Sequence, residues 1–406
     1  MVIIGGGPGG TACALALQRM AAEMGRSIHL TVVEGKQFVG EMHYNQCLGV
    51  LSPPLPELLW ERLGVRFPYQ LSRGEISRYI LHTSGEQITL DDQHQPSIAL
   101  RRVQYDAYML EVVKEHGITV VPARAVDLEF HDDRVVVYTD NSPLETDVVV
   151  GAFGMDEGTS AMFSRLTQYR PPLALSSIVT KYHPSPAAMQ AITPCIHAYL
   201  PANPKIEFGG ITTKGNHLSI NIAGSNVDAE LMKEFLCQPD VLQVLPGMQA
   251  GDGFDPANLE FYKGRFPRSQ AHAYYGDRFV VVGDAAGLVR AFKGKGVTTA
   301  VTTGIRAAET ILQQGISAQA FSEHYYKANL DIIQDLPYGQ VMRHFTIFMA
   351  HYRLLDPVVR AARHNPRLQS ALFDAASAHA PYRQVIRQSL HPDIAWAVLR
   401  AWAGRN

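Results

Sequence analysis

The chain opens with MVIIGGGPGG (residues 1–10), in which three apolar β-forming residues run directly into glycines. Three of these glycines have the spacing G-x-G-x-x-G, namely Gly5, Gly7 and Gly10. The next stretch, TACALALQRMAAEMG (11–25), is typical of a helix with a small-residue face, and SIHLTVVEG (27–35) is typical of a second strand. Strand, glycine turn, helix and strand in this order predict that a βαβ unit begins the chain.

A glycine turn in this position is suited to a dinucleotide. Gly5 permits the tight turn, Gly7 with the adjacent Pro8 lets the backbone approach a pyrophosphate, and Gly10 allows close helix–strand packing. The amide groups at the helix N-terminus favour an anion. Glu34, at the end of the second strand, is placed to accept hydrogen bonds from a ribose and would repel a 2′-phosphate. The site therefore favours NAD or FAD over NADP.

A second glycine-rich segment, RFVVVGDAAGLVRAFKGKGV (278–297), extends this interpretation. Its apolar run ends at Gly283 and Asp284, and the sequence Gly294-Lys295-Gly296 then leads into a helical pattern. A ligand that touches both loops must be long, and FAD carries a ribityl chain and a ring system beyond its pyrophosphate. We expect Asp284 to bind ribityl hydroxyls and the second loop to direct amide groups toward the flavin ring.

With these motifs the chain resembles the FAD-dependent oxidoreductases of the p-hydroxybenzoate hydroxylase type, and among them the geranylgeranyl reductase family. The resemblance covers about residues 1–315. Besides the two glycine loops, it rests on RVQYD, where Arg102 and Asp106 match an arginine-to-aspartate helix start. It also rests on DVVVGAFG, which is similar to the middle glycine motif of that family and ends at Gly154.

A cysteine loop favours the reductase branch. HYNQCLGVLSPPL (43–55) resembles a loop that lies beside the flavin in that family, and the resemblance implies that Cys47 faces the substrate cavity. There it would position an alkene or donate a proton; the alternative is a buried structural thiol. The chain departs from the family at Ala291, where a proline is usual, and at Phe153, where an acid is usual.

The order of patterns predicts an α/β protein with a Rossmann-type FAD-binding domain, an inserted antiparallel sheet and a C-terminal helical tail. We assign the FAD-binding domain to residues 1–70, 98–170 and 271–315. The substrate-binding sheet is assigned to residues 71–97 and 171–270, which read mostly as strands, and the helical tail to residues 316–406.

Composition limits the other classes of function. The 406 residues carry a net charge of −2, so we expect no nucleic-acid partner. The four cysteines are far apart and the histidines have no ligand spacing, so we expect no metal and a cytoplasmic location.

The segment FTIFMAHYRLLDPVVRAARHNPR (345–367) combines apolar positions with a basic end. Peripheral membrane contact and packing against the body are both open interpretations of it.

We therefore expect a flavoprotein that reduces carbon–carbon double bonds of a polyprenyl or other apolar substrate by hydride transfer from reduced flavin. A largely apolar wall is expected around that substrate. Because no second G-x-G-x-x-G unit occurs, NAD(P)H would bind only transiently, or a reduced protein would supply the electrons. The main alternative is a monooxygenase that hydroxylates or epoxidises an aromatic or lipid substrate. An isomerase or cyclase and a flavin-binding protein without catalysis are further alternatives.

Overall fold

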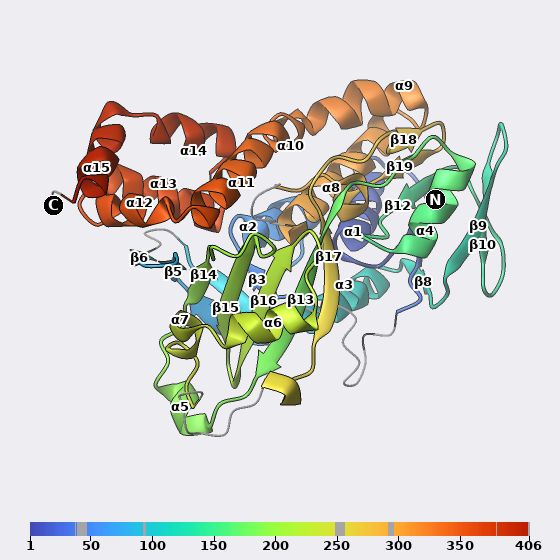
Figure 1. Cartoon of the computed structure of the whole chain (residues 1–406). Coiled ribbons are helices and arrows are strands. Elements are labelled where there is room, and N and C mark those ends of the chain that lie inside the picture. The colour runs from blue at the N-terminus through green and yellow to red at the C-terminus, as the bar shows by residue number, and fades with distance from the viewer. Residues whose placement is uncertain are drawn as a thin grey trace.

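The computed structural model of the chain describes residues 1–36, 38, 47–91, 95–247, 256–290, 296–378 and 380–404. Within these residues the strands form a six-stranded sheet, a seven-stranded sheet and two sheets of three strands each. The two larger sheets come from interleaved parts of the chain, and most of the C-terminal helices form an arm on one side (Figure 1).

The six-stranded sheet is parallel except for the edge strand β18. In spatial order its strands are β18 (Tyr275–Gly276), β19 (Phe279–Val281), β12 (Val149–Gly151), β1 (Val2–Ile4), β2 (Thr31–Val33) and β8 (Thr119–Val121). Every residue of β1, β12 and β19 is buried, as expected for parallel strands that are covered on both faces. All five parallel strands therefore end at one edge, where β1, β12 and β19 lead into the predicted glycine motifs and β2 leads into Glu34.

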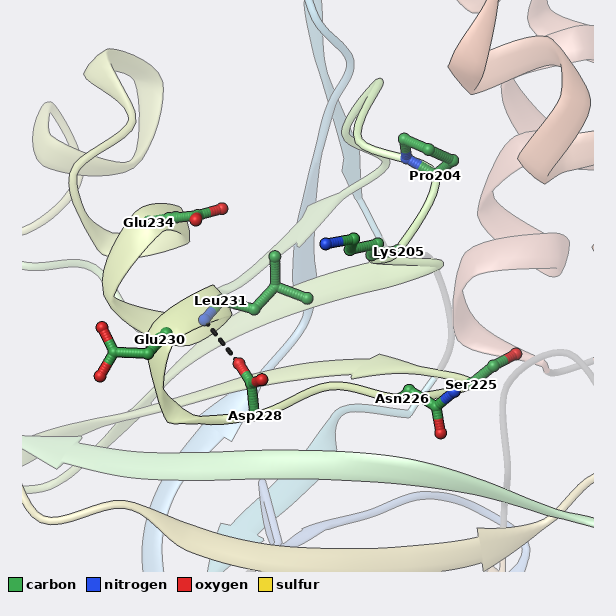
Figure 2. A pocket seen from close by; sticks show the side chains of 8 residues that line it. All are labelled: Pro204, Lys205, Ser225, Asn226, Asp228, Glu230, Leu231 and Glu234. Carbon is green, nitrogen blue, oxygen red and sulfur yellow. Dashed lines mark hydrogen bonds between the residues drawn. The ribbon is translucent and has the colours of Figure 1, made fainter.

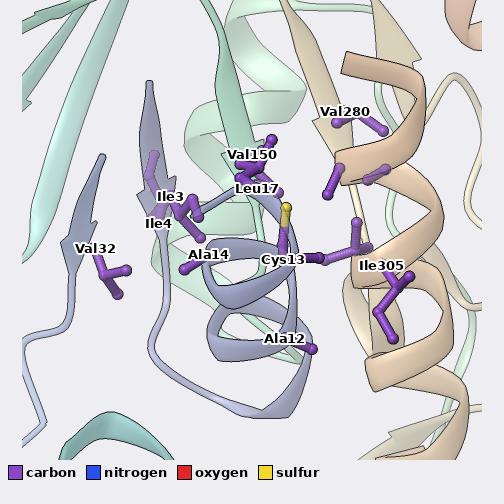
Figure 3. Close-up of a cluster of buried hydrophobic side chains, with 14 of the residues drawn as sticks. Ile3, Ile4, Ala12, Cys13, Ala14, Leu17, Val32, Val150, Val280 and Ile305 are labelled. Atoms are coloured by element: carbon purple, nitrogen blue, oxygen red, sulfur yellow. The ribbon is translucent and has the colours of Figure 1, made fainter. Parts of the chain in front are cut away.

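Helices α1 (Pro8–Glu23) and α8 (Gly296–Gln313) follow that edge in the chain, whereas α3 (Arg102–Glu115) follows a strand of another sheet, β7 (Ser97–Leu100), and leads into β8. Side chains of α1 meet those of the sheet and of α8 in one apolar cluster, in which Cys13 and Ile305 lie close to Val150 and Val280 (Figure 3). Small residues make this possible, because a Cβ on Gly304 of α8 would overlap the carbonyl oxygen of Gly9 in α1. The two helices are thus held in direct backbone contact.

The seven-stranded sheet is antiparallel except between β14 and β5. Its order is β17 (Tyr262–Pro267), β13 (Ala174–Tyr182), β16 (His217–Gly224), β15 (Phe208–Lys214), β14 (Ile196–Tyr199), β5 (Arg78–His82) and β6 (Gln87–Asp91). Helix α6 (Ala229–Leu236) covers one face, where Phe235 packs with Ile220 and Ile222 in a second apolar cluster.

Smaller elements complete the body. A three-stranded sheet of β3 (Val50–Leu51), β7 (Ser97–Leu100) and β4 (Ser72–Ile76) lies next to β15, and another consists of β11 (Leu144–Thr146), β10 (Val135–Thr139) and β9 (Ala125–Phe130). The short helices are α2 (Leu55–Leu58), α4 (Glu157–Leu166), α5 (Pro186–Gln190) and α7 (Pro239–Leu242).

The C-terminal helices are α9 (Ala318–Ala320), α10 (Leu330–Ile333), α11 (Leu336–His351), α12 (Leu355–Ala362), α13 (Pro366–Ser377), α14 (Tyr382–Ser389) and α15 (Pro392–Trp402). Helices α12 to α15 lie at the opposite end of the molecule from β9 and β10 (Figure 1). They are attached by an apolar cluster in which Phe373 packs edge-on against Tyr79 of β5. A buried ion pair between Arg343 and Glu207 fixes α11 to the segment before β15.

The predicted fold class is confirmed: a Rossmann-type parallel sheet, an antiparallel sheet and a helical tail are all present. The exact domain bounds remain a prediction. None of the helices in the described ranges has the length and apolar character needed to cross a bilayer. Among the same residues, no group of three or more histidine, cysteine or acidic side chains is arranged to hold a metal ion.

Candidate cofactor and substrate site

The first glycine loop is built by close backbone contacts. Gly5 has a φ of +110°, and a Cβ there would overlap the carbonyl oxygen of Ala152 in the loop after β12. A Cβ on Gly10 would overlap the carbonyl oxygen of Gly5. Gly7 differs, because nothing lies within 4 Å of a Cβ placed on it. The turn therefore requires two of its glycines for packing, and the third leaves open space at the N-terminus of α1.

Glu34 lies over this loop. The Gly6 N–H donates to Glu34 Oε2 at 2.8 Å, and the Lys36 N–H donates to Glu34 Oε1 at 2.7 Å. Each carboxylate oxygen has a second lone pair, and the side chain is only half-buried. The two backbone donors thus orient the carboxylate and leave it able to accept ribose hydroxyls.

The second loop follows β19. Gly283 has a φ of +63°, and Asp284 lies in a single helical turn, Gly283–Ala286. A Cβ on Gly296, the first residue of α8, would stand 3.3 Å from Asp284 Oδ1, so the carboxylate lies at the N-terminus of α8. Burial raises the pKa of Asp284 and the positive charge of Arg102 opposes the rise. Gly294 and Lys295, which were also predicted for this loop, lie outside the described residues.

Arg102 begins α3 and forms an ion pair with Asp106 one turn later. Arg102 Nη2 lies 3.0 Å from Asp106 Oδ1 and 3.2 Å from Oδ2, and both side chains are largely buried. Burial by itself would lower the pKa of Arg102, but the neighbouring Asp106 carboxylate outweighs it and raises that pKa. Arg102 is therefore a fixed cation between Asp284 and the segment that contains Cys47.

Gly154 lies on the other side of the first loop, with a φ of +58°. It lines a surface hollow together with Ser160, Tyr169 and Arg265. Phe153, which stands where the resembled family has an acid, is buried and packs 5.1 Å from the ring of Phe163. Its apolar contacts explain why an acid is absent at that position.

Cys47 lies against the seven-stranded sheet. Its side chain is partly exposed, and its carbonyl oxygen accepts a hydrogen bond of 3.1 Å from Lys214 Nζ at the end of β15. Leu48 follows, with its Cδ1 3.1 Å from a Cβ placed on Gly210. The part of this loop before Cys47, residues 43–46, lies outside the described residues. The segment from Cys47 to Gly49 thus crosses the β15–β16 hairpin on the side away from α6.

The hairpin face beneath this segment is polar. Residues paired across an antiparallel ladder share a face, and Lys214 pairs with His217, Thr212 with Ser219, and Gly210 with Asn221. We call these side chains the polar face: Thr212, Lys214, His217, Ser219 and Asn221. All five are buried. The apolar residues of both strands point toward α6 instead, so this face does not supply the largely apolar wall that we expect around the substrate.

Several polar atoms of this face have no hydrogen-bond partner among the described residues. They are Thr212 Oγ1, His217 Nε2 and Asn221 Oδ1. Buried polar groups are usually paired, so three such atoms on one face indicate a place for a ligand. Sequence reasoning missed these residues. The signal was present in GGITTKGNHLSINIAG, where polar residues alternate with isoleucine and leucine.

A separate hollow lies at the other end of the hairpin (Figure 2). It is lined by Lys205 before β15, Ser225 and Asn226 after β16, and the acidic residues of α6. Asp228 there accepts the Leu231 N–H at 2.9 Å and caps the helix. Because Lys214 and His217 flank the hairpin turn, this hollow is distinct from the Cys47 region. Asp228 is explained by the helix cap, and Glu230 forms an ion pair with Lys233.

Comparison with known proteins supports the fold. The chain matches neither a known family model nor a curated protein sequence. Among solved structures it is similar to a geranylgeranyl bacteriochlorophyll reductase-like protein from Thermoplasma acidophilum, with a TM-score of 0.72 and 16% identity over 96% of this chain and 97% of that chain. It is also similar to a flavoprotein/dehydrogenase from Cytophaga hutchinsonii, with a TM-score of 0.69 and 14% identity over 100% of this chain and 99% of that one.

A third similar structure is p-nitrophenol 4-monooxygenase from Pseudomonas putida, with a TM-score of 0.63 and 16% identity over 95% of both chains. At such identities these likenesses establish the fold and leave the reaction open. The chain has the Rossmann-type fold of flavoproteins that include reductase-like and monooxygenase members.

Proposed function

We propose that this protein is an FAD-dependent oxidoreductase. The observation that carries the proposal is the meeting of two glycine loops at one sheet edge, one with open space at Gly7 and the other with Asp284 at the N-terminus of α8. A ligand anchored at both must extend from one helix N-terminus to the other. Bound FAD would supply hydride-transfer chemistry.

Within this proposal each of the two loops binds a different part of the cofactor. The amide groups around Gly7 receive the pyrophosphate, and Glu34 accepts the adenosine ribose hydroxyls. Asp284 accepts ribityl hydroxyls and Arg102 balances its charge. Gly296, at the start of α8, presents backbone donors, and Gly154 borders the same edge from the β12 side.

For the reaction, we favour reduction of a carbon–carbon double bond in a polyprenyl or similar lipid-like substrate. Cys47 is the candidate group beside the substrate, because its segment lies between the Arg102 end of α3 and the polar face. The thiol would position the alkene or give a proton to one of its carbons. NAD(P)H that binds transiently, or a reduced protein, would supply electrons.

A monooxygenase is the second candidate, and the polar face favours it. A hydroxylated aromatic substrate presents polar groups that Thr212 and Asn221 could bind, whereas a plain prenyl chain does not. The similarity to p-nitrophenol 4-monooxygenase over nearly the whole chain is compatible with this alternative.

The two reactions differ in their need for oxygen. FAD-loaded protein is reduced under anaerobic conditions and mixed with prenyl lipids or with substituted phenols, and flavin absorbance is followed. A reductase reoxidises on addition of the prenyl lipid without oxygen. Reoxidation that requires both air and a phenol would replace the reductase by the monooxygenase.

A further inference from the structure

Lys214 is a buried cation whose hydrogen bonds are mostly unused. Its side chain is on the polar face, the residue is 4% exposed, and its ammonium group has three donors. One donor reaches the Cys47 carbonyl oxygen, and Lys214 has no ion pair with any residue in the described ranges. Burying an ammonium without a counter-charge is costly, and burial lowers the pKa of Lys214 to about 8.

The surroundings of Lys214 are positively charged. Lys181, which pairs with Ser219 across β13 and β16, points to the same face. Lys181, Arg101 and Arg102 each lower the pKa of Lys214 further, although less than burial does, and the Cys47 thiol opposes them. Asp106 is bonded to Arg102, Asp284 interacts with Arg102, and Glu260 interacts with Lys181. None of these acids forms an ion pair with Lys214 in the described ranges, so its own charge is left without a carboxylate partner.

His217 extends the same cluster. Its Nδ1 contacts Asn216 Oδ1 at 3.1 Å, whereas its buried Nε2 has no partner among the described residues. Burial, and then the charge of Lys214, lowers the pKa of His217 to about 3. A neutral imidazole donates from one nitrogen only, and since Asn216 Oδ1 accepts from Nδ1, the unpaired Nε2 is an acceptor that a hydroxyl or N–H group of a ligand could reach. Thr212 Oγ1 adds a hydroxyl that can donate.

We propose that the polar face binds an oxyanion of the substrate, a carboxylate or a phosphate, with Lys214 as its central ligand. Lys181 supplies further positive charge, and the Thr212 hydroxyl supplies a hydrogen bond. This proposal rests on the proposed function, because it places the substrate next to Cys47. It makes the substrate an amphiphile: a charged end on the hairpin and a reacting end at Cys47.

The test is direct binding to FAD-loaded protein, in which the cofactor site is already filled. Calorimetric titrations use inorganic pyrophosphate for the phosphate source, octanoate for the carboxylate source, and octanol as an uncharged counterpart. We expect one anion to bind, octanol to bind at least tenfold more weakly than octanoate or not at all, and Lys214→Met to weaken anion affinity at least tenfold. Lys205→Met, a lysine at the opposite end of the same hairpin, should bind like wild type.

Two further variants keep the test decisive. Lys214→Arg should retain most of the affinity, and Lys181→Met should reduce it even if Lys214→Met does not fold. Equal affinity in wild type and both methionine variants, or no anion binding at millimolar concentration, overturns the proposal. If wild type does not retain FAD, the proposed function fails, and the octanoate titration of the same full-length proteins still decides the anion site.

A second, independent observation concerns α11. Four large side chains repeat every three or four residues on its exposed side, namely Tyr338, Val341, Phe345 and Phe348, and Tyr352 continues this line directly after the helix. They are between 38% and 63% exposed. The opposite side, which faces the body, carries Gly339, Ala350 and the ion-paired Arg343. The helix thus turns its aromatic stripe outward, and apolar groups of this size on one exposed line mark an interaction site.

The charges around the stripe fit an anionic surface. No aspartate or glutamate occurs between Asp335 and Asp356. From residue 336 to the C-terminus there are nine arginines and three aspartates, whereas the whole chain has a net charge of −2. Four of these arginines form ion pairs within the protein, namely Arg343, Arg360, Arg363 and Arg367. Two exposed tryptophans, Trp396 and Trp402, lie on α15 in the same arm (Figure 1). Aromatic side chains with arginine are the usual anchors of proteins at the lipid headgroups.

We infer that the aromatic stripe of α11 binds the surface of an anionic bilayer. In flotation with vesicles of phosphatidylserine and phosphatidylcholine at low salt, wild type should float, and the double variant Phe345→Ser, Phe348→Ser should lose most of that binding. Trp60→Ser, which removes an exposed tryptophan outside the arm, should have no effect. Unchanged flotation of the double variant contradicts the inference. The inference is also contradicted if light scattering shows that the double variant is a monomer and wild type a dimer, while their flotation is the same.

Discussion

The six-stranded and the seven-stranded sheets make room for a ligand in opposite ways. At the edge of the six-stranded sheet, room comes from side chains that are absent: Gly5 and Gly10 allow backbone contacts, and Gly7 leaves open space. On the seven-stranded sheet, the candidate site consists of side chains that are present and buried, such as Lys214 and Asn221, and Asn221 Oδ1 has no hydrogen-bond partner among the described residues. In our proposal, the first construction would recognise the constant backbone of a dinucleotide, and the second would recognise a particular substrate.

This difference determines how each region should respond to substitution. A clash between backbone atoms moves a strand and a helix, so it should damage both stability and cofactor binding. Replacing a buried polar side chain leaves the backbone in place, so it should change specificity and pH behaviour first. The following experiments are ordered from the largest expected effect to the smallest.

Gly10→Ala and Gly7→Ala form a matched pair within one loop. The alanine methyl at position 10 would overlap the Gly5 carbonyl oxygen, and we expect a loss of at least about 3 kcal/mol in the free energy of unfolding. At position 7 the backbone φ is −73° and no atom lies nearby, so the free energy of unfolding should stay within about 0.5 kcal/mol while FAD affinity falls. Urea unfolding of both proteins without FAD measures this. Equal destabilisation would remove the distinction between packing and ligand-facing glycines.

Lys214→Met tests the polar face through pH. The folded-state pKa of Lys214 is about 8 and its ordinary value is 10.5. Between these values the unfolded chain holds more protons than the folded chain, so wild-type stability should rise with pH. The free energy of unfolding of wild type, relative to that of Lys214→Met, should therefore rise by roughly 3 kcal/mol from pH 8 to pH 10.5. Lys205→Met is the control, and a gap that does not change with pH would mean that Lys214 is not a buried cation.

Asp284→Ala tests the second loop. If the carboxylate accepts ribityl hydroxyls, its loss should weaken FAD binding by about 1–3 kcal/mol. The same change removes a buried acid whose pKa is raised by burial, so the protein without FAD should not be destabilised at pH 7. Quenching of flavin fluorescence gives the affinity and thermal unfolding gives the stability. Unchanged affinity would place Asp284 outside the cofactor site.

Cys47→Ser is expected to have the smallest effect, because it keeps a donor of similar size. FAD binding and flavin reduction should be unchanged. Anaerobic, substrate-dependent reoxidation should slow about tenfold, which corresponds to about 1.4 kcal/mol of barrier. A wild-type rate in the variant would mean that the Cys47 thiol is only structural. The contribution of the residue would then be its carbonyl oxygen, which accepts the hydrogen bond from Lys214.

The same comparison explains what the sequence could predict. The first loop is encoded by spacing along one continuous stretch, so Gly5, Gly7, Gly10 and Glu34 could be placed without a structure. Asp284 could be placed because it follows an apolar strand of the same type. Gly294 and Lys295 stay predictions, as they lie outside the described residues.

The substrate side could not be predicted in this way. Lys214 and Cys47 are 167 residues apart in the sequence and meet only through the way β15 lies against the segment before β3. The direction in which Lys214 points depends on the register of the hairpin, and a shift of one residue would turn it toward α6. Alternation in the sequence indicates two faces, but it does not say which face meets the cofactor.

The most direct test of the central claim is the identification of the bound cofactor in purified protein. The protein is denatured, the released small molecules are separated by liquid chromatography, and the protein without cofactor is then titrated with FAD, FMN and NAD. We predict FAD at close to one per chain, or stoichiometric uptake of FAD with little affinity for FMN or NAD. Recovery of NAD, or failure to take up FAD by a folded protein, would contradict the account.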